Sequence, residues 1–444
     1  MTTTYWCEHA QLPDKVHAGV RITTDGGRIT EVMPRTTARE NDIRLRGVTL
    51  PGLANAHSHA FHRMLRGRTH GDGGNFWTWR DQMYAVTEQL NPDTYFALAR
   101  GVFAEMLAAG YTVVGEFHYL HHDVGGRPYS DPNAMGAALI AAAEEVGIRL
   151  TLLDTCYLAG GLSSDGHLPL DEVQQRFSDG SVEAWAARVR ELRDSDLVRI
   201  GAAAHSVRAL TGAQLAEFAS AVSALGERPV HAHVSEQVAE NITTEMVYGA
   251  SPVEHLADAG LLREGFTAVH ATHLSDIDLE LMGCSGAAAC FCPTTERDLA
   301  DGIGPACELA GQGVSISLGS DQHAVIDPFE ELRGIEMHER LKSHERGRFG
   351  VADLLEMATS AGYRSLGWDG GELRVGQLAD FVSVRTDSRR TGGVAPGQVV
   401  FAATGADVRE VVVGGERVVS AGVHRLGPVD DVVAEAIAAV RSTS

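Results

Sequence analysis

Short apolar runs alternate with longer amphipathic stretches along most of the chain. The apolar runs have the length of β-strands and end near Ala56, Phe117, Asp154, Ala204, Val234, Ala271, Phe291 and Leu318. Helix-like patterns fill intervals between them, over residues 92–109, 132–146, 181–193, 211–225 and 252–259. Strands that alternate with helices are typical of βα units and a parallel sheet. Eight strands of this kind predict an α/β fold, a (β/α)8 barrel of the TIM type.

The two ends of the chain follow a different pattern. Residues 1–50 and 371–425 contain short alternating runs, such as 19–22 and 381–384, separated by glycine-containing turns. We expect the two segments to pair as one small β-sandwich domain beside a catalytic barrel of residues 51–370. Residues 426–444 are expected to form a C-terminal helix and tail.

Composition narrows the choice of partner. The 444 residues are 44% hydrophobic and 22% charged, as in an ordinary soluble globular protein. The formal net charge of -22 argues against a nucleic acid or an anionic membrane, because either needs a basic protein surface. We therefore expect a small-molecule substrate.

The cysteines and the N-terminal residues indicate the cellular compartment of the protein. Six cysteines are too few and too irregularly spaced for a disulfide framework in a chain of this length, which indicates a reducing environment. The segment Met1 to Trp6 lacks the basic and apolar parts of a signal peptide, and no run approaches 18 uninterrupted apolar residues. A cytoplasmic location is expected.

Histidines and a carboxylate follow four of the predicted barrel strands. His57 and His59 form an H-x-H pair after the first strand, His233 closes another, His270 follows a third and Asp321 follows the last. Residues i and i+2 of a strand point to the same face, so an H-x-H pair can bind one ion. The C-terminal ends of barrel strands also surround one site. These residues are therefore predicted to converge on one metal ion.

The ligand types suit Zn²⁺, while Fe²⁺ or Mn²⁺ remain open, because a mixed nitrogen and oxygen set discriminates poorly among these ions. A lysine that could bridge two metals would lie on the strand at 198–204, which contains none. A single divalent ion is the simpler prediction.

A bound Zn²⁺ lowers the pKa of its water from 15.7 to about 7, which supplies hydroxide as a nucleophile at neutral pH. Asp321 is placed to accept the proton of that water. Glu236, three residues after His233, could protonate the departing nitrogen, and such acid–base help is worth about 10²–10⁴-fold. His270 would hydrogen-bond the hydroxide or polarise the substrate, and we favour it over His273 because it lies closer to the strand end.

These residues resemble the amidohydrolase superfamily, in its branch of deaminases with one metal ion. The split β domain fits this resemblance, as does the stretch 376–382, GQLADFV. More narrowly, four segments resemble the formimidoylglutamate deiminases, enzymes of histidine degradation. They are FWTWR at 76–80, EFHYLHHD at 116–123, HSVR at 205–208 and CPTTE at 292–296.

The resemblance implies hydrolytic deimination of N-formimidoyl-L-glutamate to N-formyl-L-glutamate and ammonia, by attack of metal-bound hydroxide on the formimidoyl carbon. It implies a homodimer and the metal ligands His57, His59, His233 and Asp321, with Glu236, His270 and Asp321 catalytic. The substrate would be bound by Arg208, His205, Tyr119, Arg80 and His62. Two arginines suit a dicarboxylate, since each guanidinium can bind a carboxylate through two hydrogen bonds. Arg80 could act in its own subunit or in a neighbouring one.

Two positions depart from the pattern of the formimidoylglutamate deiminases. His62 stands where they have glutamine, and Gln322 stands where they have serine. A second hypothesis is therefore an aminohydrolase of the same branch that acts on guanine, cytosine or an adenosine derivative such as S-adenosylhomocysteine, for which an aromatic slot would be expected instead of two arginines. A third is an inactive barrel that serves as a binding module, but no expected ligand or acid is missing from the sequence.

Two further clusters are predicted to have structural roles. Cys290-Phe291-Cys292 has a spacing seen in metal sites, but its position on a barrel strand favours core packing. His118, His121 and His122 are expected to support the site or to lie on the surface.

Overall fold

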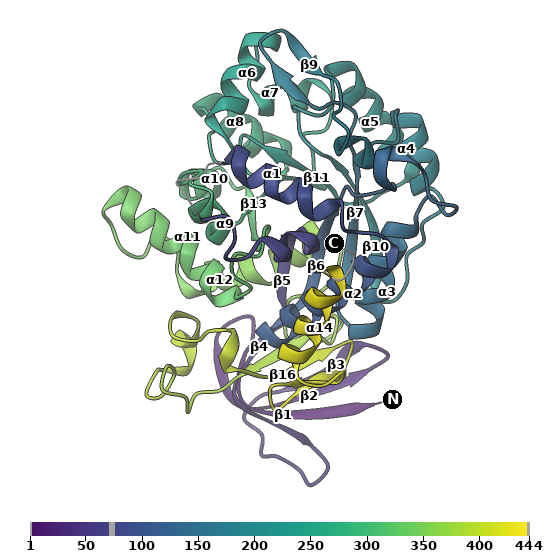
Figure 1. Ribbon diagram of the computed structural model, residues 1–444. Helices are drawn as coiled ribbons and strands as arrows, with labels where there is room; N and C mark the ends of the chain where they lie inside the picture. Colours follow the sequence, from purple (N-terminus) through teal and green to yellow (C-terminus); the bar gives the residue numbers. More distant parts are fainter. Residues whose placement is uncertain (1, 71–75, 442–444) are drawn as a thin grey trace.

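The computed structural model describes residues 2–70 and 76–441, and its centre is a barrel of eight parallel strands (Figure 1). In order around the barrel these are β5 (Leu53–Ser58), β6 (Tyr111–His118), β7 (Arg149–Cys156), β10 (Val198–Ala204), β11 (Val230–Val234), β12 (Phe266–His270), β13 (Ala288–Phe291) and β14 (Ser315–Leu318). The eight strands predicted from the apolar runs are confirmed. Each run reads as nearly continuous apolar sequence because both faces of a parallel barrel strand are buried.

The barrel closes between its first and last strands at the residues of the predicted metal site. Ser58 and Asp321 form a parallel bridge. The carbonyl of His57 accepts the N–H groups of Ser320, at 3.1 Å, and Asp321, at 3.0 Å. Closure of the sheet therefore brings the first and last predicted ligands side by side.

Helices surround the barrel, as Figure 1 shows. They are α1 (Phe76–Thr87), α2 (Pro92–Ala109), α3 (Ala134–Val146), α4 (Val182–Val189), α5 (Gly212–Leu225), α6 (Val238–Tyr248), α7 (Pro252–Asp258), α8 (Asp276–Ser285), α9 (Pro293–Asp298), α10 (Ala306–Gly311), α11 (Pro328–Ser343), α12 (Val351–Ala358) and α13 (Ser360–Ser365). A short hairpin, β8 (Gly161–Ser163) and β9 (Gly166–Leu168), lies at the end of the barrel opposite the β domain.

The ends of two helices illustrate how local sequence sets their length. At the start of α2, the Asn91 side chain accepts the N–H groups of Asp93 and Thr94, and at its end Gly110 has a φ of 109°, which favours glycine. Helix α4 is shorter than the predicted 181–193. The N–H groups of Glu191 and Leu192 bond back three residues, and this tighter turn ends the helix.

The second domain is a mixed sheet built from both ends of the chain. Strands β1 (Thr3–Gln11), β2 (Val16–Asp25), β3 (Arg28–Met33) and β4 (Ile43–Pro51) join β15 (Phe381–Val384), β16 (Val408–Val413), β17 (Glu416–Ser420) and β18 (Val423–His424). The two halves meet where β4 pairs antiparallel with β15. Helix α14 (Val429–Arg441) follows the sheet and packs against α2.

A buried ion pair ties the barrel to this β domain. Arg149 on β7 donates to both oxygens of Asp380, at 2.7 and 3.1 Å. Asp380 also accepts the hydroxyl of Tyr363 and the N–H of Gly414. Within residues 2–70 and 76–441, no helix has the length and apolar character that crossing a membrane requires.

Candidate metal centre and active site

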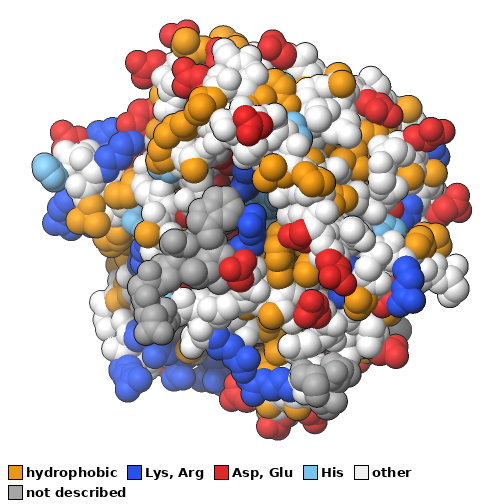
Figure 2. All heavy atoms as spheres, turned by 45° about the horizontal axis from the view of Figure 1, so that its top comes forward, with side chains coloured by type: hydrophobic (Ala, Val, Ile, Leu, Met, Phe, Trp, Pro, Cys, Tyr) orange, Lys and Arg blue, Asp and Glu red, His pale blue; other side chains and the backbone are white. Residues whose placement is uncertain are grey.

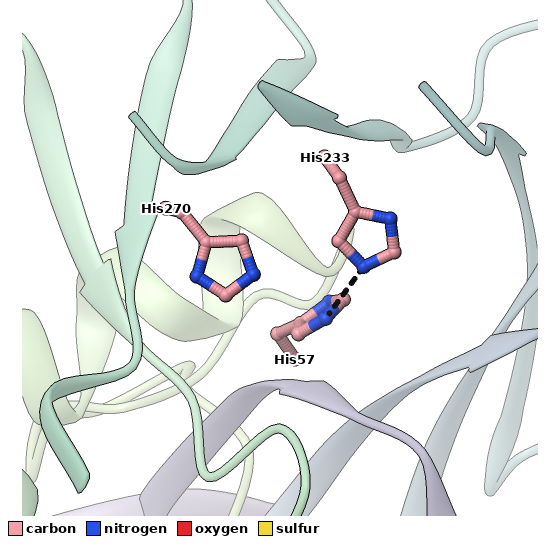
Figure 3. Close-up of side chains that lie close together, drawn as sticks. All are labelled: His57, His233 and His270. Carbon is pink, nitrogen blue, oxygen red and sulfur yellow. Dashed lines mark hydrogen bonds between the residues drawn. The ribbon is translucent and has the colours of Figure 1, made fainter. Parts of the chain in front are cut away.

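Four predicted ligands converge at the C-terminal end of the barrel. The Nε2 atom of His233 lies 3.2 Å from Nε2 of His57 and 3.4 Å from Nε2 of His59. Asp321 Oδ1 lies 3.4 Å from each of the latter two nitrogens. Ligands about 2.0–2.1 Å from a tetrahedral zinc ion are about 3.3 Å apart, so these separations fit one ion at their centre. Figure 3 shows the rings of His57 and His233 turned toward each other, with His270 beside them.

The hydrogen bonds behind the rings leave nitrogen lone pairs facing inward. Nδ1–H of His59 donates to the carbonyl of Phe117, and Nδ1–H of His233 donates to the carbonyl of His205, each at 2.9 Å. In a neutral imidazole the Nε2 atom is then the acceptor. Lone pairs this close repel one another, so the donor set is suited to a cation.

Burial also favours the protonation states that a metal needs. It lowers the pKa of His57 and His233, and it lowers the pKa of His59 to about 3. Burial opposes ionisation of Asp321, but the hydrogen bond from His57 and the nearby histidines hold the pKa of that carboxyl below its usual range. Metal ligation requires neutral imidazoles and an ionised carboxylate, which is the combination favoured here.

Glu116 holds the H-x-H segment from behind, a role that the sequence analysis did not assign. Its carboxylate accepts the hydroxyl of Ser58 and the N–H of Ala60, each at 2.6 Å. Burial raises the pKa of Glu116 to about 8, although these two hydrogen bonds oppose the rise. The available signal in the sequence was that Glu116 is the one carboxylate in strand β6.

His270 and Glu236 lie beside the metal cluster. His270 Nε2 is 3.8 Å from Glu236 Oε1 and 3.9 Å from Asp321 Oδ2, and its Nδ1 is 3.6 Å from Glu296 Oε1. Burial lowers the pKa of His270, but Glu236, Glu296 and Asp321 outweigh it and raise the pKa to about 10. His273 instead donates from Nε2 to the backbone carbonyl of Asp301. The pair next to the cluster is thus His270 and Glu236.

A cavity opens above this pair. Its lining includes every residue that the sequence analysis proposed for substrate binding: His62, Arg80, Tyr119, His205 and Arg208. Arg80 contributes to the cavity of its own chain, where its guanidinium lies 5.5 Å from the ring centre of Tyr84. Figure 2 looks toward this end of the barrel, and basic side chains lie in a hollow of that face.

Much of the cavity wall is aromatic. Trp79, Tyr84, Tyr157 and Phe177 line it together with Tyr119. His62 Nε2 and the hydroxyl of Tyr119 form a hydrogen bond of 3.0 Å. The ring centre of His62 lies 4.5 Å from that of His59. The site therefore combines the two arginines expected for a dicarboxylate with the aromatic surface expected for a ring.

Arg208 contacts two carboxylates. Its Nη2 atom lies 3.5 Å from Glu236 Oε2, and its Nε atom lies 3.7 Å from Glu240 Oε2. Glu240, in the first turn of α6, was missed by the sequence analysis, although it follows Glu236 by only four residues.

The two other clusters named in the sequence analysis have structural roles. His118, His121 and His122 are all buried, which is contrary to a surface position. His121 donates to the carbonyl of Thr155, and His122 pairs with Asp179. Cys290 and Cys292 pack with Ala56 and Val269 in a small core cluster, so core packing is confirmed for them. The side chain of Trp77, in the segment 76–80, lies outside the described residues.

The amidohydrolase family model matches residues 48–418. The chain therefore belongs to the amidohydrolase family. The formimidoylglutamate deiminase of Pseudomonas aeruginosa is 36% identical over 438 residues, which cover 94% of this chain and 95% of that protein. A crystal structure of an amidohydrolase from Brucella melitensis covers 99% of both chains with a TM-score of 0.91 and 33% identity.

A second group of relatives acts on adenosine derivatives by name. The 5-methylthioadenosine/S-adenosylhomocysteine deaminase of Natronomonas pharaonis is 28% identical over 413 residues, which cover 90% of this chain and 88% of that protein. Together the family and the relatives identify this chain as a deaminase of the amidohydrolase superfamily that hydrolyses a carbon–nitrogen bond.

Proposed function

We propose that this protein hydrolyses N-formimidoyl-L-glutamate to N-formyl-L-glutamate and ammonia. The observation that carries the proposal is one cavity in which Arg80 and Arg208 lie on the wall and Glu236, His270 and Asp321 lie at the metal cluster. The similarity to the deiminase of Pseudomonas aeruginosa supports the same substrate.

The reaction adds the oxygen of water to the formimidoyl carbon and breaks the bond from that carbon to its terminal nitrogen. A divalent ion held by His57, His59, His233 and Asp321 would supply activated water, and Zn²⁺ is our choice, with Fe²⁺ or Mn²⁺ as alternatives. Asp321 accepts the proton of the water. Glu236 carries a proton to the terminal nitrogen, which then leaves as ammonia. His270 holds the attacking oxygen by a hydrogen bond.

The charges at the base of the cavity suit the cationic end of this substrate. Glu236 and Asp321 line the cavity there, and both lie within 4 Å of His270. A formimidoyl group is an amidine, which carries a positive charge when protonated. Opposite charges at short distance in a water-poor site attract strongly, so an amidinium is favoured there over a neutral base.

The dicarboxylate end would bind at the wall. Arg208 and Arg80 supply the two guanidinium groups, and Tyr119, His205 and His62 supply further hydrogen bonds. A guanidinium can bind a carboxylate through two parallel hydrogen bonds, which fixes the orientation of the substrate as well as its charge.

The decisive experiment is ammonia release by protein of known metal content. N-formimidoyl-L-glutamate is compared with guanine, cytosine and S-adenosylhomocysteine at equal concentration, and with N-formimidoylglycine, which lacks the second carboxylate. We expect efficient turnover of the first compound and a much higher KM for the glycine analogue. Turnover of a ring compound alone would refute the substrate assignment and retain the metal-dependent hydrolysis.

The aromatic wall favours a second candidate, deamination of an adenosine derivative. Tyr84, Tyr119, Tyr157 and Phe177 offer a surface on which a purine could stack. The relatives that act on 5-methylthioadenosine and S-adenosylhomocysteine support it. The same ammonia assay separates the two candidates.

The assembly and the compartment stay predictions. A homodimer is proposed on the frequency of such assemblies, and light scattering of the metal-loaded protein would test it. A cytoplasmic location is proposed on the cysteine pattern.

A further inference from the structure

Asp301 is a buried carboxylate that the proposed reaction does not use. It is 5% exposed and follows α9 in a loop where Ala300 has a φ of 60°. Its Oδ1 atom accepts a hydrogen bond from Gln237 Nε2. Its Oδ2 atom is buried and has no hydrogen-bond partner among the residues that the structure describes. A buried carboxylate oxygen without a partner is costly, so this position calls for a cation or a donor.

Asp301 faces the catalytic pair. One carboxylate oxygen of Glu236, one of Asp301 and one ring nitrogen of His270 lie within 4.8 Å of one another. All three residues are at most 5% exposed. The loop is held in place because His273 Nε2 donates to the backbone carbonyl of Asp301 at 2.8 Å. Two carboxylates and an imidazole are a ligand set that binds divalent transition metals.

We propose that Glu236, His270 and Asp301 form a second divalent-cation site, and that an ion bound there inhibits the enzyme. Ligands of a tetrahedral zinc ion are about 3.3 Å apart, so side-chain movements of about 1–1.5 Å bring these three atoms, now within 4.8 Å of one another, to that separation. The first cluster keeps its own four ligands. Inhibition follows because the second ion occupies the carboxylate that carries the proton and the imidazole that orients the attacking oxygen.

The test adds Zn²⁺ to protein that already contains one metal ion per chain. Calorimetry and equilibrium dialysis measure the second ion, and ammonia release is measured over the same range of Zn²⁺ with whichever substrate the enzyme turns over. For the wild type we expect a second Zn²⁺ per chain and a parallel loss of activity. Calorimetry and dialysis need no substrate, so an error in the proposed substrate does not change their result.

Asp301→Asn should bind the second Zn²⁺ more weakly by about tenfold or more, since removing even an outer-shell group from a metal site costs about 10–100-fold. When the activity of Asp301→Asn is normalised to its value with one ion bound, the Zn²⁺ concentration that halves this activity should rise by the same factor. Asp301→Glu keeps the charge and should bind the second ion more tightly than Asp301→Asn. Asp298→Asn is the matched control, because Asp298 ends α9 three residues before Asp301 and bonds Gln322 and His70 instead.

Three results would overturn the proposal. The first is a wild-type protein that binds a single Zn²⁺ per chain. The second is an Asp301→Asn variant whose second-ion affinity equals that of the wild type. The third is binding of the second Zn²⁺ without loss of activity, which would remove the inhibitory role.

Discussion

Arg208 Nη2 lies 3.5 Å from Glu236 Oε2, so the arginine proposed to bind a substrate carboxylate contacts the carboxylate proposed to move the proton. Glu240 approaches the same guanidinium from its Nε side, at 3.7 Å. A substrate carboxylate that binds Arg208 would compete with Glu236 for the Nη2 atom. Substrate binding would thereby free Glu236 for proton transfer, which couples recognition at the wall to chemistry at the metal.

Arg208→Gln should raise KM for N-formimidoyl-L-glutamate far more than it lowers kcat. A hydrogen bond to a charged group contributes about 1.5–3 kcal/mol, which corresponds to about 10–150-fold in KM. Steady-state kinetics give both parameters. Arg127→Gln is the control, because Arg127 lies on an exposed loop and pairs with Asp123. An unchanged KM in Arg208→Gln would exclude Arg208 from the carboxylate site.

Glu236→Gln should retain one metal ion per chain and lose about 10²–10⁴-fold in kcat, because glutamine keeps the shape of the side chain but cannot transfer a proton. Metal analysis and kcat are measured on the same sample. Glu245→Gln, at an exposed position of α6, should behave as the wild type. Full activity in Glu236→Gln would show that another group moves the proton.

The barrel and the convergence of His57, His59, His233 and Asp321 could be predicted because their signals are local. The strands can be recognised in the sequence as short apolar runs. The pair His57 and His59 can be recognised because residues i and i+2 of a strand point to the same face. Glu116 and Asp301 could not be assigned in this way. Glu116 matters because it reaches Ser58, 58 residues away, and Asp301 because its loop folds back onto Glu236. Such partners are set by tertiary packing, which the local pattern does not encode.

The cavity wall shows the same limit. The sequence pointed to Arg80, Arg208 and Tyr119 through the resemblance to a known family. Tyr157 and Phe177 complete the aromatic surface with Tyr119, from segments that gave no signal of their own. The two arginines by themselves favour a dicarboxylate substrate. The assembled cavity also has an aromatic surface, which suits a ring compound.

Removing the metal with a chelator should abolish ammonia release and lower the Tm. The inward-facing lone pairs of His59 and His233, whose Nε2 atoms are 3.4 Å apart, lose the cation between them. A ligand at about 100 times its Kd stabilises the folded state by about 2.7 kcal/mol, and that contribution disappears. Activity should return with Zn²⁺, Fe²⁺ or Mn²⁺, and the most active ion identifies the preferred metal. In His59→Gln the chelator should change the Tm less, and an equal change would argue that stabilisation arises elsewhere.

A buried ion pair outside the active site should shape the response to acid. Asp179 bonds Arg188 at 2.8 Å and His122 at 3.1 Å, and its side chain is 7% exposed. Burial opposes ionisation, but these two partners hold the pKa of Asp179 below its usual range. The folded-state pKa is therefore lower than the unfolded value of about 3.9. The stabilisation is complete above the unfolded pKa and is lost as the pH falls toward the folded pKa, because the unfolded state then binds the proton more readily.

Asp179→Asn should lose about 1.5–3 kcal/mol of unfolding free energy at pH 7, because Arg188 loses one charged partner but keeps Asp154 at 2.7 Å. Its stability should also fall less steeply than that of the wild type below about pH 4. Urea denaturation at pH 7, 5, 4 and 3 measures both effects. Asp123→Asn is the control, because Asp123 forms an exposed pair with Arg127 and contributes little. If Asp179→Asn followed the wild-type pH dependence, the acid sensitivity of the fold would have to arise from other carboxylates.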